Sequence, residues 1–343
     1  MDSLGRKELM TKRKKVWDNL PKVPLYKPNL DAFYRFMYER HMIWVRRFSL
    51  KEPPPWTKDR ILRDYKFTNV YRELDRGTIW YVEHVCASIR SRDDFQDLLW
   101  QTVMYRLLNR VQTFEKVGLI NYDSWLDARK DWKKALQKLH ETESVFTSAH
   151  LTLPTHEIGS NKIDKYIEVL DTTHKLMPKL VIEIEECTKL EYLFDILQQI
   201  PCVGDFISYE ICCDLMLVEA VPFSENDWVN PGPGAKGGIK LIFPLSKTTE
   251  DFVVAMRKLQ HTQEDHFKRL KLEFPYFHKD GNGKPKLLTL RSIEHSLCEF
   301  RKYCNVKEGM GKPRMKFKPQ DWSNAQGQLP FRFPREEKSL EIV

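Results

Sequence analysis

The sequence predicts an all-α protein, on three observations. Apolar residues recur at intervals of three and four over most of the 343 residues, which is the spacing of amphipathic helices. Almost no window alternates apolar and polar residues for long enough to indicate a strand. The hydrophobic content of 41% is enough to bury a large core. We expect one closely packed unit, although the length also allows two lobes.

The first expected helix runs from Leu30 to Phe48, where Phe33, Phe36 and Met37 share one face. The prolines 53–55 end it, because proline lacks the backbone N–H that a helix needs. A turn-rich connection is expected over residues 274–286. The same helical spacing predicts further helices over residues 71–89, 94–109, 125–139, 163–187, 189–199, 206–218, 250–272 and 289–303.

These patterns divide the chain into three parts. Residues 1–28 are expected to be a flexible basic segment, 29–304 a helical catalytic domain with a helix-hairpin-helix near 196–216, and 305–343 a basic tail. The run Lys12-Arg13-Lys14-Lys15 is typical of a nuclear localisation signal or a phosphate-binding arm, although such runs are more often simply solvated.

The charge and the cysteines limit the class of protein. A formal net charge of +8 suits a polyanionic partner, because Lys and Arg that face phosphates release condensed counterions. No 18-residue apolar run is present, which argues against a membrane protein. Seven cysteines without Cys-x-x-Cys spacing argue against a disulfide framework or a zinc cluster. We expect a reducing location, nuclear or cytoplasmic.

A candidate DNA-binding hairpin lies at Ile200–Asp205. One helix ends at a proline-containing turn and the next begins after Gly204, which leaves backbone N–H groups to hold a phosphate. Val203, Gly204 and Asp205 are therefore candidate DNA contacts. Cys202 stands where a Gly-x-Gly hairpin has its first glycine, so the turn must be one that an L-residue tolerates. As a bare pattern, the segment is equally typical of a plain interhelical turn.

Two acids follow the hairpin. Glu225 and Asp227 could act as a general base or hold a metal ion near an extruded nucleotide, and Trp228 offers a stacking surface for its base. The alternative is a helix start, with Ser224 or Asn226 as the N-cap and the acids favoured by the helix dipole.

A glycine-rich segment comes next. Gly232-Pro-Gly-Ala-Lys-Gly237 matches Gly-x-Gly-x-x-Gly, but no strand precedes it, so a dinucleotide-binding fold is excluded. What the pattern favours is a phosphate contact through Gly232, Gly234 and Lys236, with a helix from Gly238. The sequence contains no P-loop motif.

Charged groups also stand on three of the predicted helices. Arg72 and Arg110 belong to two of these charged segments, and paired arginines near an acidic cluster would suit a bound triphosphate, because guanidinium groups are bidentate phosphate ligands. Arg106 lies in the same helical segment as Arg110, and Glu299 shares a helix face with Lys302. Any of these groups could equally belong to ordinary salt-bridged surface.

In this order, the motifs resemble the 5-hydroxymethyluracil DNA kinase family, which is also known as alpha-glutamyl/putrescinyl thymine pyrophosphorylase. The resemblance covers residues 30–318. It is carried by residues 33–47, Pro55-Trp56-Thr57, 65–76, 106–110, the hairpin with Phe223–Ala235, and Leu297–Tyr303.

The resemblance implies an all-helical fold related to helix-hairpin-helix DNA glycosylases, with two lobes around a DNA-binding cleft. It implies transfer of the γ-phosphate of ATP to the hydroxymethyl oxygen of hydroxymethyluracil in DNA, with Mg²⁺ as the metal. Asp227 would deprotonate or orient that group and Glu225 would assist or bind Mg²⁺, while the glycines, Lys236 and the two arginines would hold the phosphates.

One departure separates the chain from part of the glycosylase group. Phe206 stands where glycosylases with lyase activity carry a lysine, so an imine-forming route is closed. The spacing from Gly204 to Asp227 is longer than in typical glycosylases, so the identity of the essential acid stays open. Two alternatives remain: a monofunctional glycosylase that excises a modified pyrimidine, and a non-catalytic DNA-binding module.

Overall fold

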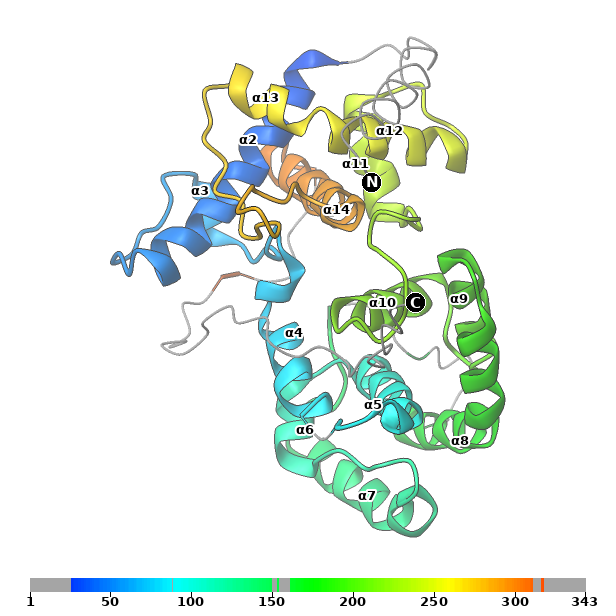
Figure 1. The fold of residues 1–343 in the computed structure, drawn as a ribbon. Coiled ribbons are helices and arrows are strands. Elements are labelled where there is room, and N and C mark those ends of the chain that lie inside the picture. The colour runs from blue at the N-terminus through cyan, green and yellow to red at the C-terminus, as the bar shows by residue number, and fades with distance from the viewer. Residues whose placement is uncertain (1–25, 88, 150–152, 154–160, 311–315, 318–343) are drawn as a thin grey trace. The chain divides into compact units, whose positions relative to one another are not determined.

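The structure is a computed structural model, which describes residues 26–87, 89–149, 153, 161–310 and 316–317. This part of the chain is helical, and its extended pairing is limited to two isolated bridges, Tyr65 with Lys316 and Lys279 with Pro285 (Figure 1). The predicted all-α class is therefore confirmed. None of the described helices is long and apolar enough to cross a membrane.

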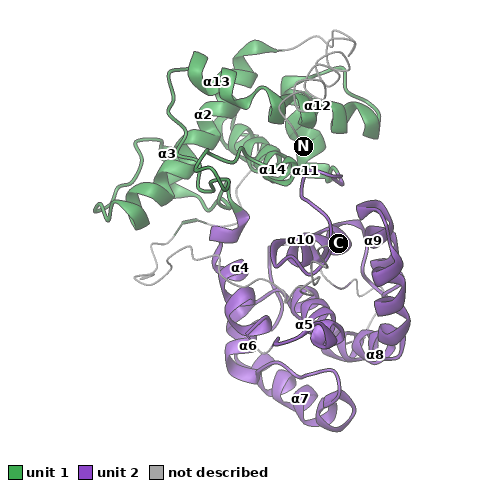
Figure 2. Ribbon diagram, in the orientation of Figure 1, with its two compact units in different colours: residues 1–71, 231–320 green, residues 72–230, 321–343 purple. Residues whose placement is uncertain are grey.

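The chain forms two compact units rather than the single packed unit expected. Unit 1 takes its described residues from Met1–Tyr71 and Pro231–Gln320, and unit 2 takes its own from Arg72–Asn230 (Figure 2). Each unit has its own buried core. The apolar face of a single helix shows that the helix is packed, but not which of the two cores it packs against. The basic run at 12–15 and most of the segments 1–28 and 305–343 lie outside the described residues.

Unit 1 packs around a cluster of aromatic rings. Phe33 on α2 lies edge-on to Phe300 on α14, with ring centroids 5.4 Å apart, and both side chains are fully buried. The helix expected over 250–272 is two helices that meet at Thr262. The elements of unit 1 are α2 (Lys27–Trp44), a π-helical turn (Val45–Ser49), α3 (Arg60–Asp64), α11 (Pro233–Ile242), α12 (Thr249–His261), α13 (Gln263–Arg269) and α14 (Leu290–Lys307).

Helix α11 begins at Pro233, five residues before the start expected at Gly238. It packs closely along α14, and its glycines make that approach possible. A Cβ on Gly234 would lie 2.2 Å from Cys298 Sγ, and one on Gly238 would lie 2.2 Å from the backbone oxygen of Leu297. Packing alone therefore requires glycine at both positions, although the sequence pattern had predicted a phosphate contact for Gly234 and a helix start at Gly238.

Unit 2 is built around α5, whose residues are almost all buried. The region expected to be one helix over 71–89 consists of three short helical segments of different type. Helix α6 (Val111–Val117) was not predicted, because seven residues are too few to show a clear helical period. The elements of unit 2 are η2 (Arg72–Leu74), α4 (Arg76–Trp80), η3 (Tyr81–Val85), η4 (Arg92–Asp94), α5 (Phe95–Leu108), α6 (Val111–Val117), α7 (Trp125–His140), α8 (Lys162–Glu186), α9 (Leu190–Leu197) and α10 (Asp205–Leu217).

The predicted hairpin consists of α9, a turn, and α10. Ser208 ties the two helices together by donating to the carbonyl oxygen of Phe194 at 2.6 Å. Gly204 is the N-cap of α10 with an ordinary φ of −90°, whereas Cys202 has a φ of 65°. An L-residue therefore occupies the left-handed conformation that the usual hairpin gives to glycine. DNA binding by this hairpin stays a prediction.

We expect Cys202→Gly to raise the free energy of unfolding by about 0.5–1 kcal/mol. The left-handed conformation costs an L-residue roughly 1–2 kcal/mol, and the extra freedom of glycine in the unfolded chain offsets part of the gain. Denaturant unfolding measures the difference. Cys202→Ala removes the thiol but keeps the strain, so it should give no increase; an equal increase in both variants would contradict the explanation.

Candidate active site

The acids predicted to be catalytic lie in a turn, not at a helix start. The Ser224 N–H donates to a carboxylate oxygen of Asp227 at 2.8 Å, and the Asp227 N–H donates back to the Ser224 carbonyl oxygen at 2.9 Å. The next helix begins only at Pro233, so neither Ser224 nor Asn226 is a helix N-cap. Asp227 is exposed and Glu225 is half-buried, which leaves both carboxylates within reach of a substrate.

Trp228, the predicted stacking residue, packs against the hairpin of unit 2. Its ring centroid lies 5.1 Å from that of Phe194 on α9 and 5.9 Å from that of Tyr209 on α10. These contacts fix the residue that follows Asp227 onto both helices of the hairpin. The acidic turn is thus anchored to the hairpin through Trp228, while stacking on a base stays a prediction.

A buried ion pair joins α5 to α10, the second helix of this hairpin. The guanidinium of Arg106 donates to both carboxylate oxygens of Asp214, and the side chain of Asp214 is fully buried. Burial alone would lower the pKa of Arg106, but the charges of Asp214 and Glu210 outweigh it and raise the pKa above its usual value. Arg106 is therefore neither salt-bridged surface nor a phosphate ligand, as the sequence left open, but a charged element of the core.

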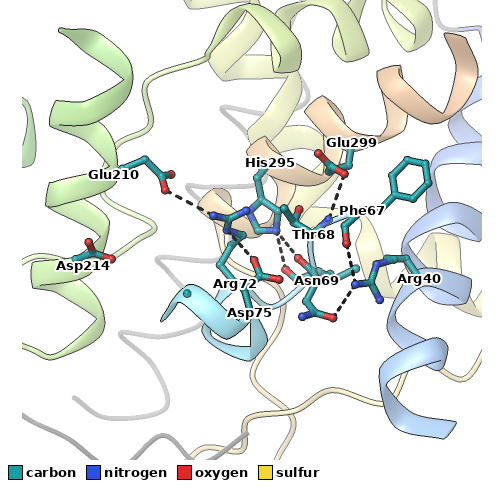
Figure 3. Close-up of polar contacts among 12 residues, drawn as sticks. Arg40, Phe67, Thr68, Asn69, Arg72, Asp75, Glu210, Asp214, His295 and Glu299 are labelled. Carbon is teal, nitrogen blue, oxygen red and sulfur yellow. Dashed lines mark hydrogen bonds and ion pairs between the residues drawn. The ribbon is translucent and has the colours of Figure 1, made fainter. Parts of the chain in front are cut away.

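The pair continues toward the start of the unit as a chain of alternating charges. Arg106 Nη1 donates to Glu210 at 2.8 Å. Glu210 in turn lies 3.6 Å from Arg72 Nη2, and Arg72 Nε lies 3.3 Å from Asp75 (Figure 3). Arg72 thus lies between two carboxylates and is about one-fifth exposed. A phosphate bound at Arg72 would share the guanidinium with both of them.

Arg110, the second predicted phosphate ligand, occupies a different place in unit 2. Its Nη2 donates to Glu143 at 3.1 Å, and Lys116 also contacts Glu143. Arg72 and Arg110 therefore have separate carboxylate partners, and the described contacts do not join them in one clamp. Triphosphate binding by either residue stays a prediction.

Unit 1 brings two of the resemblance motifs together. The segment that ends at Tyr71 lies on α14, where the N–H of Thr68 donates to Glu299 at 3.2 Å and Lys302 donates to the same oxygen at 2.9 Å. His295 Nε2 lies 2.9 Å from the carbonyl oxygen of Val70, so this nitrogen carries the hydrogen (Figure 3). The expected shared face of Glu299 and Lys302 is confirmed.

The same segment is held from the other side by α2. Arg40 Nη2 donates to the side-chain oxygen of Asn69 and to the carbonyl oxygen of Phe67, both at 2.9 Å (Figure 3). Asn69 is thereby fixed between α2 and α14, three residues before Arg72. Two helices far apart in the sequence thus hold residues 67–70 within unit 1.

The predicted phosphate-binding residues Gly232, Gly234 and Lys236 belong to unit 1. The Gly232 N–H donates to the carboxylate of Glu294 at 3.2 Å, so an anionic group already lies at the start of α11. Lys236 Nζ lies 5.9 Å from the ring centroid of Phe252 on α12. A phosphate role for these residues stays a prediction.

No group of three or more His, Cys, Asp or Glu side chains is placed to hold a metal ion within the described part of the chain. Mg²⁺ is commonly held by one or two carboxylates together with substrate phosphates and water. A site at Glu225 and Asp227 would therefore need the nucleotide or water to complete it. Mg²⁺ binding by these two acids stays a prediction.

Glu210, Asp214 and His295 were not singled out from the sequence. Asp214 could have been found, because a single carboxylate within the apolar run of α10 signals a buried charge that needs a partner. Arg106, in the apolar second half of α5, carries the matching signal. Glu210 precedes the same apolar run by one residue and carries a similar signal, whereas His295 stands between Glu294 and Ser296 and shows none.

Residues 27–312 match the family model described as "5-hmdU DNA kinase, helical domain". The chain belongs to this 5-hmdU DNA kinase helical-domain family. Within the family, it is 30% identical over 294 residues to the 5-hmdU DNA kinase of Bacillus phage SP10, which is 80% of this chain and 45% of the phage protein. The chain thus spans less than half the length of that relative. No solved structure matches it.

The match to the helical-domain family confirms the resemblance that the ordered sequence motifs indicated. It begins at the start of α2 and extends past the end of α14, so it includes both compact units. Both the loop at Asn69 and the turn at Asp227 lie within it.

Proposed function

We propose that the chain acts in the ATP-dependent phosphorylation of the 5-hydroxymethyl group of hydroxymethyluracil in DNA, a step toward hypermodified thymine. The observation that carries this proposal is the family match over residues 27–312. The 30% identical phage relative, which is named a 5-hmdU DNA kinase, supports the same substrate class. The formal charge of +8 suits a nucleic-acid substrate.

The proposed reaction forms a bond between the hydroxymethyl oxygen and the γ-phosphorus of ATP, and breaks the bond from that phosphorus to ADP. The proton of the hydroxymethyl group passes to a carboxylate, for which we propose Asp227, with Glu225 assisting or binding Mg²⁺. The exposure of Asp227 supports this role, because a general base must reach the hydroxyl that it deprotonates. Mg²⁺ would neutralise charge on the transferring phosphoryl group.

The proposed nucleotide site depends on cationic residues and not on a glycine-rich loop. The chain contains no P-loop motif, and packing against α14 already accounts for Gly234 and Gly238. We propose that Arg72 and Arg110, both in unit 2, contact the phosphates of ATP, in a catalytic domain spanning residues 29–304. Arg72 is the best supported of these, because it follows the anchored Asn69 by three residues and its guanidinium stays about one-fifth exposed.

The proposal is tested by incubating the protein with γ-labelled ATP, Mg²⁺ and duplex DNA that contains hydroxymethyluracil. We expect the label to enter the DNA. A matched duplex with thymine in the same positions should stay unlabelled, because it lacks the accepting hydroxyl. Equal labelling of both duplexes, or none of either with any divalent metal, would contradict the proposal.

A further inference from the structure

Four cationic side chains gather on three helices of unit 1, and we call them the basic strip: Lys236, Lys240, Lys258 and Arg301. The ammonium groups of Lys236 and Lys240 lie 5.9 and 5.7 Å from the ring centroid of Phe252. Lys258 lies 5.9 Å from the ring of Phe243. The buried rings thereby hold three charges in place at the surface.

Arg301 extends the strip onto α14. Its Nη1 donates to the carbonyl oxygen of Pro233 at 3.0 Å, and its side chain covers Gly237, where a Cβ would lie 2.4 Å from Arg301 Cδ. The residue is exposed, and a guanidinium has four further N–H donors after this bond. Because Gly237 has no side chain, the guanidinium of Arg301 can lie against α11 at the residue that follows Lys236.

Some cations of unit 1 have a carboxylate partner, whereas the four strip residues have none among the described residues. Arg46 pairs with Glu39, Arg269 with Asp31 and Lys302 with Glu299. Within the residues that the structure describes, none of the four strip residues has a carboxylate within ion-pairing distance. The four cations are therefore not neutralised by an ion pair within the described part of the chain.

Two features of this arrangement oppose the stability of α11, although Lys240 lies in its last turn, where the helix dipole favours a cation. Lys236 and Lys240 are four residues apart on one helix face, where like charges cost about 0.2–0.5 kcal/mol. Lys236 also lies in the first turn, where the helix dipole disfavours a cation. An external anion on this face would reduce the repulsion between the two lysines, because the carboxylate of Glu294 contacts the start of α11 at Gly232 and forms no ion pair with either lysine.

We propose that the basic strip binds the phosphate backbone of DNA without regard to sequence. The charges run along three helices and lie at the surface instead of converging on one enclosed group, which fits an extended polyanion better than a triphosphate. Lys236 then contacts DNA and not ATP. The inference rests on the proposed function in taking DNA as the substrate.

The test is the salt dependence of binding to unmodified duplex DNA, measured by fluorescence anisotropy without ATP. Each phosphate contact contributes about 0.9 to the slope of log affinity against log salt. We expect Lys236→Ala with Lys240→Ala to reduce this slope by about 2 and to weaken binding at low salt. Lys258→Ala with Arg301→Ala should do the same, so a folding defect in one pair leaves the other informative.

The matched control removes two lysines of α7 that have carboxylate partners, Lys133→Ala with Lys134→Ala. Its slope should stay at the wild-type value. A wild-type slope in both strip variants overturns the inference, as does weaker ATP binding in calorimetry with an unchanged DNA slope. A reduced slope in a protein that labels no DNA would instead support the strip and contradict the proposed kinase reaction.

Discussion

Asp227→Asn is expected to lower the rate of phosphate transfer to DNA by about 10²- to 10⁴-fold, the range for loss of a general base. Asparagine keeps a side-chain oxygen that can accept the Ser224 N–H, so the turn around residue 224 should be preserved. The change thus removes the proton acceptor and leaves the local hydrogen bond. Single-turnover kinetics with hydroxymethyluracil DNA measure the loss.

Glu225→Gln is the matched variant, because it removes the neighbouring charge from the same turn. If Glu225 binds Mg²⁺, its loss should be partly reversed at high Mg²⁺ concentration, whereas the loss in Asp227→Asn should not. DNA affinity should stay at the wild-type value in both variants. A full rate in Asp227→Asn together with a large loss in Glu225→Gln would assign the base to Glu225.

Asp214→Ala is expected to lower the free energy of unfolding by about 3–5 kcal/mol, the cost of removing one partner of a buried ion pair. The change leaves the buried guanidinium of Arg106 with Glu210 as its remaining described carboxylate partner. Because the pair joins α5 to α10, the loss should be seen in denaturant unfolding.

The control replaces both charges with apolar residues, Arg106→Met with Asp214→Leu. No buried charge is left unpaired in this double variant, so it should regain most of the stability lost in Asp214→Ala. A loss below about 1 kcal/mol in the single variant, or an equal loss in both, would show that the pair is not the feature that fixes α10.

Helices could be predicted from the sequence where the local pattern of apolar residues determines the structure. Helices α5, α7, α8, α10 and α14 lie within a few residues of their predicted ranges, because each has a long apolar face or a buried run of apolar residues. The chain around Gly232–Gly238 was predicted less well. Its glycines suggested a loop, but those from Gly234 onward are helical and serve the contact with α14, which depends on a distant part of the sequence.

The candidate site could be predicted only in part, because several of its contacts join residues that are distant in the sequence. Asp227 could be found from its place after the hairpin, whereas the partners of Arg72 and Arg106 come from α10, more than 100 residues later. Spacing within one helix cannot show such pairs. The resemblance implied two lobes, but helical periodicity could not show which segments form each unit, because unit 1 combines segments from both ends of the described chain.

The central claim is that the chain takes part in adding phosphate to hydroxymethyluracil in DNA. The most direct test is mass spectrometry of the bases and nucleosides of hydroxymethyluracil DNA after incubation with the protein, with and without ATP. We predict a nucleoside heavier by one phosphate group with ATP and an unchanged nucleoside without it. Release of the free base without ATP, or an unchanged nucleoside in both samples, would contradict the account.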